Sequence, residues 1–252
     1  MTIGIMGAMS EEIQHIIAEL SDRQDHETSQ RTFHTGQLWG KPVVLVFARW
    51  GKVAAATTAT TLIHRFGVKE ILFTGVAGAV DHALSLGDIV VGKHLYQHDL
   101  DARPFFSRHE IPLLGVSALP TCSKRRTRLE RAVETFLRED LGPVKSEAQK
   151  LGINLPNPRL VTSDIASGDK FFAEKSAIHE LQSRLPSVSC VEMEGAAVAQ
   201  VCHEHQIPFS IMRTISDSGD EKAPVDFAAF VNNVASAYSH GVIRHLLQMD
   251  EL

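Results

Sequence analysis

The stretch Val188-Ser189-Cys190-Val191-Glu192-Met193-Glu194-Gly195 begins as a short apolar, β-branched run and ends in two acids around a methionine. Such a run is typical of a buried strand that stops where the polar residues begin. Similar runs recur at Ile3 to Met6, Val43 to Phe47, Ile71 to Thr74, Ile89 to Val91, Leu160 to Ile165 and Phe209 to Ile215. The stretch therefore predicts one strand of a larger sheet.

The segments between these runs carry apolar residues at helical spacing. They are Glu11 to Leu20, Val53 to Phe66, Ala173 to Leu185, Ala196 to His205 and Phe227 to Leu247. This alternation predicts an α/β fold: a single-domain, three-layer sandwich in which a mixed, twisted sheet is flanked by helices. Because such folds bind ligands at the carboxyl ends of their strands, the residues just after each strand are the functional candidates.

Composition and charge limit the partners of this chain. Its 252 residues are 44% hydrophobic and 22% charged, which predicts one domain over residues 1–252 with a large core. The net charge of -5 gives no reason to expect nucleic acid and favours a small substrate. No apolar run reaches membrane-spanning length, and the N-terminus lacks the basic region of a signal peptide. Three widely spaced cysteines favour reduced thiols in the cytoplasm over disulfides or a thiolate metal site.

One segment, Thr121 to Asn157, departs from this alternation. It opens with Lys124-Arg125-Arg126, has a helical pattern from Leu129 to Glu139 and continues as polar sequence from Gly142 to Asn157. We expect a peripheral excursion rather than a second domain. The basic cluster has no interleaved aromatic residues, which favours a solvated helix start over a nucleic-acid site.

Two glycine-containing turns follow predicted strands. Gly7-Ala8-Met9 leads into a helix that carries Glu12, although a Glu at a helix start can equally serve only the helix dipole. Thr74-Gly75-Val76-Ala77-Gly78 would let backbone approach a ligand closely. It lacks the Gly-x-Gly-x-x-Gly spacing of a dinucleotide site, so a purely structural turn is an equal alternative.

Acids also end two predicted strands. Burying Glu192 and Glu194 costs free energy unless they find partners, which the vicinal hydroxyls of a ribose would supply, and Met193 offers a soft surface to sugar or base. In the second strand, alternation places Arg213 on the same side as Ile215. A protonated Asp at the end of Arg213-Thr214-Ile215-Ser216-Asp217 could donate to a purine nitrogen or simply cap a turn. Aromatic residues in loop or helix-start settings, which suit base stacking or core packing, are Phe171, Phe172 and Phe227.

Together these segments resemble the nucleoside phosphorylase and nucleosidase superfamily, and within it the 5′-methylthioadenosine/S-adenosylhomocysteine nucleosidases. The resemblance covers nearly the whole chain. The matching runs are Ile3-Gly4-Ile5-Met6-Gly7-Ala8-Met9, Gly51-Lys52-Val53-Ala54-Ala55-Ala56, Gly87-Asp88-Ile89-Val90-Val91, Ser167-Gly168-Asp169, Glu192-Met193-Glu194 and Ile215-Ser216-Asp217.

The resemblance implies hydrolysis of the N-glycosidic bond, which releases adenine and a 5′-substituted ribose. It implies that Glu12 is the general base for water, that Arg213 helps to orient this water, and that Asp217 donates a proton or a strong hydrogen bond to N7 of adenine. Glu194 would bind the ribose hydroxyls, with Glu192 in support. The substrate-binding residues that it implies are Ala8, Met9, Trp50, Val76, Ala77, Gly78, Phe105, Phe171, Phe172, Glu192, Met193, Glu194, Ser216 and Phe227.

The resemblance also implies a homodimer. His98, Asp99 and Phe105 would lie in a segment that reaches the dimer interface, with Phe105 closing the partner's pocket around an apolar 5′-thio group. This sequence departs from the family where Val76 replaces a frequent Ser, and where Arg49 and Trp50 replace small or aliphatic residues. These departures affect the expected water network and the 5′ pocket.

Two other function classes stay open. A phosphorylase of this fold needs cationic side chains that bind phosphate. The side chains of Phe73 and Val76 cannot bind phosphate, and the charge of Glu12 would repel it. Arg49 is a candidate phosphate ligand. A non-catalytic nucleoside sensor would need neither a water base nor a leaving-group acid. No metal or cofactor is expected, because carboxylates alone can serve an oxocarbenium-like route. The identity of the 5′ group stays open among methylthioadenosine, S-adenosylhomocysteine, 5′-deoxyadenosine and 6-amino-6-deoxyfutalosine.

Overall fold

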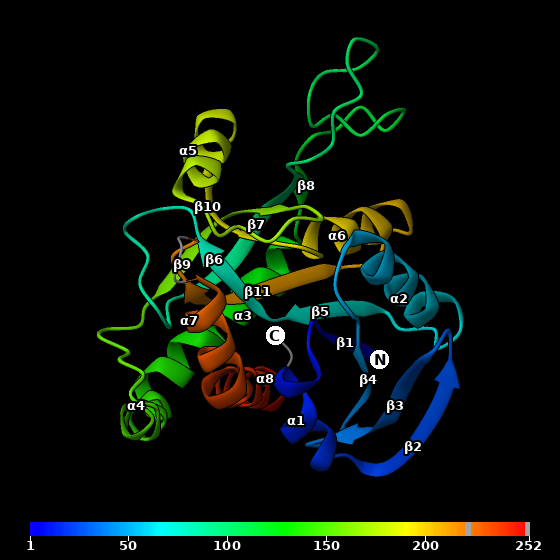
Figure 1. The fold of residues 1–252 in the computed structure, drawn as a ribbon. Helices are drawn as coiled ribbons and strands as arrows, with labels where there is room; N and C mark the ends of the chain where they lie inside the picture. Colours follow the sequence, from blue (N-terminus) through cyan, green and yellow to red (C-terminus); the bar gives the residue numbers. More distant parts are fainter. Residues whose placement is uncertain (220–222, 250–252) are drawn as a thin grey trace.

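The computed structural model describes residues 1–219 and 223–249, which form one mixed sheet with helices on both faces (Figure 1). The strands in the described residues are β1 (Ile3–Gly7), β2 (Ser21–Thr28), β3 (Arg31–Leu38), β4 (Lys41–Phe47), β5 (Glu70–Thr74), β6 (Val76–Ala79), β7 (Ile89–Gln97), β8 (Leu119–Pro120), β9 (Leu160–Ser167), β10 (Val188–Glu192) and β11 (Phe209–Asp217). Their order is β2-β3-β4-β1-β5-β11-β6-β10-β9-β7-β8, so the predicted mixed sheet is confirmed.

Strand β11 organises the sheet because it pairs with three neighbours. Its first residues pair in parallel with β5, and its later residues pair in parallel with β6 and antiparallel with β7. The pairing with β7 closes the strands β11, β6, β10, β9 and β7 into a ring. The sequence did not predict this closure, because pairing between strands so far apart in the chain leaves no local pattern.

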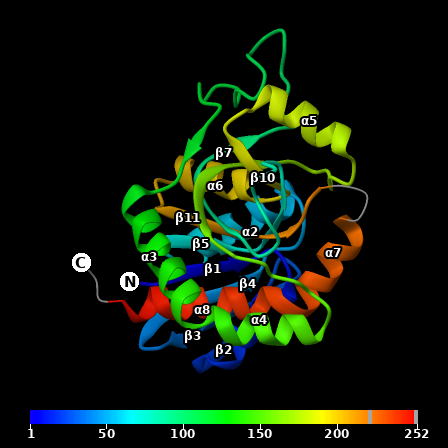
Figure 2. The same ribbon diagram turned by 90° about the vertical axis from the view of Figure 1, so that its left-hand side faces the viewer.

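The helical segments in the described residues are η1 (Ser10–Glu12), α1 (Gln14–Ala18), α2 (Lys52–His64), α3 (Ser123–Glu139), α4 (Leu141–Lys150), α5 (Lys175–Arg184), α6 (Gly195–Glu204), α7 (Ala223–Phe230), η2 (Val231–Ala235) and α8 (Ser236–Gln248). Helices α2 and α6 pack together over one face of the sheet, and α3 packs against α8 over the other (Figures 1 and 2). None of the helices within residues 1–219 and 223–249 is long and apolar enough to cross a membrane.

Three predicted helices need correction. The helix expected from Glu11 to Leu20 is a 3-10 turn followed by the five-residue α1. The helix expected from Phe227 to Leu247 starts earlier, at Ala223, and contains the π-helical turn η2. Within the Thr121 to Asn157 excursion, α3 begins at Ser123 and the expected polar segment includes α4. The first half of that excursion is not peripheral, because α3 buries Leu129, Ala132, Val133 and Phe136 in the main core.

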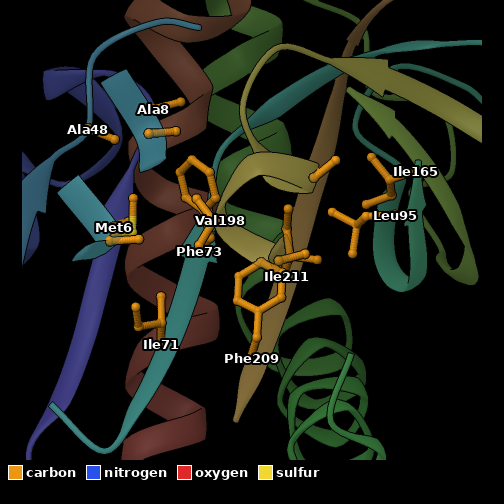
Figure 3. Packing of buried hydrophobic residues seen from close by; sticks show 14 of the residues in the cluster. Met6, Ala8, Ala48, Ile71, Phe73, Leu95, Ile165, Val198, Phe209 and Ile211 are labelled. Carbon is orange, nitrogen blue, oxygen red and sulfur yellow. The ribbon is translucent and has the colours of Figure 1, made fainter. Parts of the chain in front are cut away.

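Apolar packing between the sheet and its helices fixes the strand ends that carry the site. Phe209 and Ile211 of β11 lie beside Ile71 and Phe73 of β5 in a cluster that also includes Val198 of α6 (Figure 3). Each such buried side chain contributes about 1.5–3 kcal/mol relative to exposure. This packing and the pairing of β5 with β1 and β11 position these strands, whose carboxyl ends lead into the polar residues of the site.

Candidate active site

A cavity opens at the carboxyl ends of β1, β10 and β11. It encloses about 570 Å³ of space, part of it open to solvent, which is the size of a small-molecule site. Its lining residues are Ala8, Met9, Glu12, Trp50, Val76, Ala77, Gly78, Lys170, Phe171, Phe172, Val191, Glu192, Met193, Glu194, Ser216, Asp217 and Phe227. The structure thus brings together the residues that the sequence singled out, except Arg213 and Phe105.

Glu12 is the buried carboxylate at the end of β1. Its side chain is fully excluded from solvent, and its Oε2 accepts a hydrogen bond of 2.9 Å from the Met9 N–H. Its Oε1 has no hydrogen-bond partner in residues 1–219 and 223–249. Burial raises the pKa of Glu12 to about 7, and the Arg213 charge opposes this rise only in part. Glu12 is therefore poised to exchange a proton near neutral pH.

Arg213 lies beneath the cavity rather than in its wall. Its Nη2 donates to Glu192 Oε2 at 2.6 Å, and its guanidinium carbon lies 4.1 Å from the centre of the Phe73 ring. Gly75 makes room for it, since a Cβ there would lie 3.0 Å from Arg213 Nη1 and 3.3 Å from Glu12 Oε1. Arg213 therefore partly balances the charge of the buried acids, and it forms an ion pair with Glu192 that the sequence did not predict.

Glu192 and Glu194 have different roles in the structure. Glu192 is saturated: besides Arg213, it accepts hydrogen bonds from the Ser167 hydroxyl and from the Gly195 N–H. Glu194 accepts one of 2.8 Å from the Gly51 N–H. Burial and then the neighbouring Glu192 raise the pKa of Glu194 to about 8. Both acids line the cavity; the contacts of Glu192 support the local structure, and Glu194 is the candidate for binding a ligand.

Asp217 is the last residue of β11 and lines the cavity. Its Oδ2 accepts a hydrogen bond of 2.8 Å from the Ser216 hydroxyl, and its Oδ1 accepts one of 2.9 Å from the Gly219 N–H. The register between β11 and β6 shifts at this point, and a Cβ on Gly78 would lie 2.9 Å from Asp217 Oδ1. Glycine at position 78 therefore leaves room for this carboxyl group at the cavity wall.

Aromatic rings form the mouth of the cavity. Phe227 meets Trp50 and Phe171 edge to face, with ring centres 6.1 Å and 5.6 Å away. Phe172 is buried beneath them, and the Lys170 ammonium lies 5.6 Å from the centre of its ring. Sequence reasoning missed Lys170, because a lysine in a polar loop gives no signal of a site, and missed Val191, because it reads as an ordinary strand residue.

Phe105 does not reach the cavity of its own chain. Its side chain is 85% exposed, on the long segment between β7 and β8 that projects from the body of the molecule (Figure 1). Val53, at the start of α2, is another exposed apolar residue, with 79% of its surface accessible.

Comparison with known proteins agrees with this geometry. A family model described as the phosphorylase superfamily matches residues 2–248. A 5′-methylthioadenosine/S-adenosylhomocysteine nucleosidase of Shewanella loihica is 32% identical over 92% of both chains. The chain belongs to this nucleosidase family of the phosphorylase superfamily.

Solved structures of this family have the same fold. The nucleosidase of Colwellia psychrerythraea, solved in complex with adenine, has a TM-score of 0.86 and 32% identity, covering 98% of this chain and 95% of that one. A futalosine hydrolase of Helicobacter pylori has a TM-score of 0.82 and 31% identity, covering 98% of each chain. Both the fold class and the family expected from the sequence are therefore confirmed.

Proposed function

We propose that this protein hydrolyses the N-glycosidic bond of 5′-methylthioadenosine and S-adenosylhomocysteine, releasing adenine and the 5′-substituted ribose. The observation that carries the proposal is the set of three buried carboxyl groups around one cavity, Glu12, Glu194 and Asp217, in a chain whose family relatives are named for this activity. Each carboxyl group has a separate task in the reaction.

Glu12 is the base that activates water. Its buried Oε1 has no hydrogen-bond partner within the described residues, so it can take a hydrogen bond from a water beside the sugar. As the bond from C1′ to N9 breaks, the water oxygen bonds to C1′ and its proton passes to Glu12. Arg213 acts on this step through its charge, which favours the ionised form of Glu12.

Glu194 holds the ribose. In its ionised form, which its pKa of about 8 favours at mildly alkaline pH, the carboxylate accepts hydrogen bonds from the 2′- and 3′-hydroxyls. These contacts strengthen as positive charge develops on the sugar. Met193 packs against the ring with its thioether. The positive charge develops because the bond to adenine breaks, and adenine is a good leaving group only if it departs without a negative charge.

Asp217 protonates N7 of adenine, so that the base departs as a neutral molecule. Ser216 and the Gly219 N–H orient its two oxygens. The main chain at Phe172 reads the adenine edge, and Phe171 and Phe227 pack against the base and sugar. The reaction uses one water. Afterwards Glu12 releases its proton to solvent and Asp217 takes one up from solvent, which restores both groups.

Several features favour water over phosphate as the nucleophile. Phe73 lies under the Arg213 guanidinium, and Val76 presents an apolar side chain to the cavity. Arg49 Nη2 donates to the Gln30 carbonyl at 2.5 Å, which directs its charge away from an anion site in the cavity. Lys170 belongs to the cavity wall, but its ammonium lies 5.6 Å from the centre of the Phe172 ring. A phosphate that attacked the sugar would have to approach the Glu12 carboxylate, which repels it.

A homodimer in the cytoplasm completes the proposal. The exposed apolar side chains of Phe105 and Val53 would be covered by a second copy, and Phe105 would close the partner's cavity around the 5′ group. The three cysteines are free thiols, which suits a reducing compartment.

Phe105→Ser is expected to lower kcat/KM for methylthioadenosine at least about tenfold, because the apolar 5′ group would lose its cover. The matched control is Leu151→Ser, which changes another exposed apolar residue, at the end of α4. Equal kinetics for Phe105→Ser and the wild-type protein would exclude the proposed contact.

The substrate test is adenine release from methylthioadenosine, S-adenosylhomocysteine, 5′-deoxyadenosine and 6-amino-6-deoxyfutalosine, measured beside inosine. We expect methylthioadenosine and S-adenosylhomocysteine to be cleaved and inosine to be cleaved at least about 100-fold more slowly, because its base presents a different edge to the Phe172 main chain. The futalosine hydrolase neighbours support aminodeoxyfutalosine as the alternative substrate. Preference for inosine would contradict the proposed function.

A further inference from the structure

Two successive backbone N–H groups at the start of α2, those of Gly51 just before the helix and of its first residue Lys52, donate to different carboxylates. The Gly51 N–H donates to Glu194 Oε1 at 2.8 Å, and the next N–H, of Lys52, donates to Asp169 Oδ1 at 2.8 Å. Glu194 belongs to the cavity, whereas Asp169 is an exposed residue of the loop after β9. The position of one short turn, at residues 51 and 52, is therefore fixed by both acids.

The side chain of Lys52 closes this arrangement into a ring of contacts. Its Nζ lies 2.6 Å from Asp99 Oδ1 and 3.2 Å from Gln97 Oε1. The other oxygen of Asp99 accepts a hydrogen bond of 3.0 Å from the Asp169 N–H. We call Lys52, Asp99 and Asp169 the anchor cluster. It joins three segments that are distant in the chain: the start of α2, the end of β7 and the loop after β9.

The backbone around the anchor cluster is shaped for this close approach. Gly51 has a φ of +91°, which favours glycine, and a Cβ there would lie 3.0 Å from Asp169 Oδ1. A Cβ on Gly168 would lie only 2.2 Å from His98 Nε2. Although burial opposes it, contact with the Lys52 ammonium and the Asp169 N–H keeps the pKa of Asp99 below its ordinary value. The cluster is therefore a charged, closely packed junction rather than a loose surface pair.

We infer that the anchor cluster, although it lies outside the cavity, positions two parts of the site. It orients the Gly51 N–H toward Glu194, and it holds in place the loop that continues from Asp169 into Phe171 and Phe172. The inference rests on the proposed function, in which Glu194 must accept hydrogen bonds from the ribose. The Gly51 N–H favours the ionised, accepting form of that carboxylate. None of the three cluster residues lines the cavity, so each is a positioning residue.

Lys52→Met tests this inference, because it removes the ammonium and keeps the aliphatic chain. The readout is the ratio of kcat/KM for methylthioadenosine to that for its 2′-deoxy analogue, which a merely structural role would not move. We expect this ratio to fall about tenfold, because the 2′-deoxy analogue already lacks one hydroxyl for Glu194. We also expect the acid limb of kcat/KM to move to higher pH. An unchanged ratio and an unchanged acid limb would overturn the inference.

Two further sets of variants separate positioning from general destabilisation. Lys150→Met removes an exposed lysine from a comparable pair, 2.5 Å from Glu147, and should leave the ratio unchanged. Asp169→Asn keeps an oxygen for the Lys52 N–H and should retain the ratio better than Asp169→Ala; equal ratios would overturn the inference even if Lys52→Met fails to fold. Absence of cleavage by the wild-type protein would instead contradict the proposed function itself.

Discussion

Glu12→Gln lowers kcat for adenine release by a factor of about 10³ or more, because glutamine cannot take the proton of the attacking water. The loss should appear mainly in kcat, since the base and ribose contacts at Asp217 and Glu194 are unchanged. Single-turnover release of adenine from methylthioadenosine measures it. A matched control is Glu19→Gln, which changes a carboxylate exposed near α1. Wild-type turnover by Glu12→Gln would remove the assigned role.

The same substitution is expected to stabilise the fold. The pKa of Glu12 is about 7 in the folded protein, against 4.5 for an ordinary glutamate, so the folded state holds the proton more tightly than the unfolded chain. Below pH 4.5 both states are protonated and the variant should match the wild type. Between pH 4.5 and 7 the wild type loses stability as pH rises, and above pH 7 the full cost of about 3 kcal/mol is present. Glutamine avoids this cost.

Thermal unfolding across this pH range checks the prediction. The Tm of Glu12→Gln should exceed that of the wild type at pH 8, and the two values should converge below pH 4.5. A lower Tm for the variant at pH 8 would mean that the ionised carboxylate stabilises the fold. That result would contradict the cost expected from burying Glu12, whose Oε1 has no hydrogen-bond partner in the part of the chain that the structure describes.

Asp217→Asn is the second large effect, with an expected loss of about 10³ in kcat for methylthioadenosine. Asparagine can still donate a hydrogen bond toward N7, but it cannot transfer a proton to the leaving base. The loss should therefore shrink for a nucleoside whose base leaves readily as an anion.

The comparison of these two leaving groups separates proton transfer from misfolding. Asp226→Asn, in the exposed part of α7, is the matched control and should retain turnover. An equal loss for both kinds of leaving group would contradict the role of Asp217 as the acid.

Sequence reasoning located the acids of the site because each follows a strand. Strands that end at the same edge of the sheet bring Glu12, Glu194 and Asp217 together, and each is buried at the cavity as that rule predicts. The roles given to these residues stay predictions. The local pattern was less informative from Glu11 to Leu20. Its apolar spacing predicted one continuous helix, but the structure has a 3-10 turn followed by a five-residue helix.

Contacts between distant segments could not be predicted from the sequence. Alternation gave the side of β11 on which Arg213 lies, but its partners, Glu192 and the ring of Phe73, depend on how three strands are arranged. The closure of the sheet by β7 and the ring of contacts made by Lys52 are of the same kind. Such contacts need the tertiary fold, because no single segment contains both partners.

The origin of the new oxygen on the sugar tests the proposed hydrolysis most directly. Methylthioadenosine is cleaved in ¹⁸O-labelled water with and without inorganic phosphate, and the sugar product is examined by mass spectrometry. We expect methylthioribose with ¹⁸O bound to C1, formed at the same rate in both samples. Methylthioribose 1-phosphate without the label, formed only when phosphate is present, would contradict hydrolysis and assign the protein to the phosphorylases.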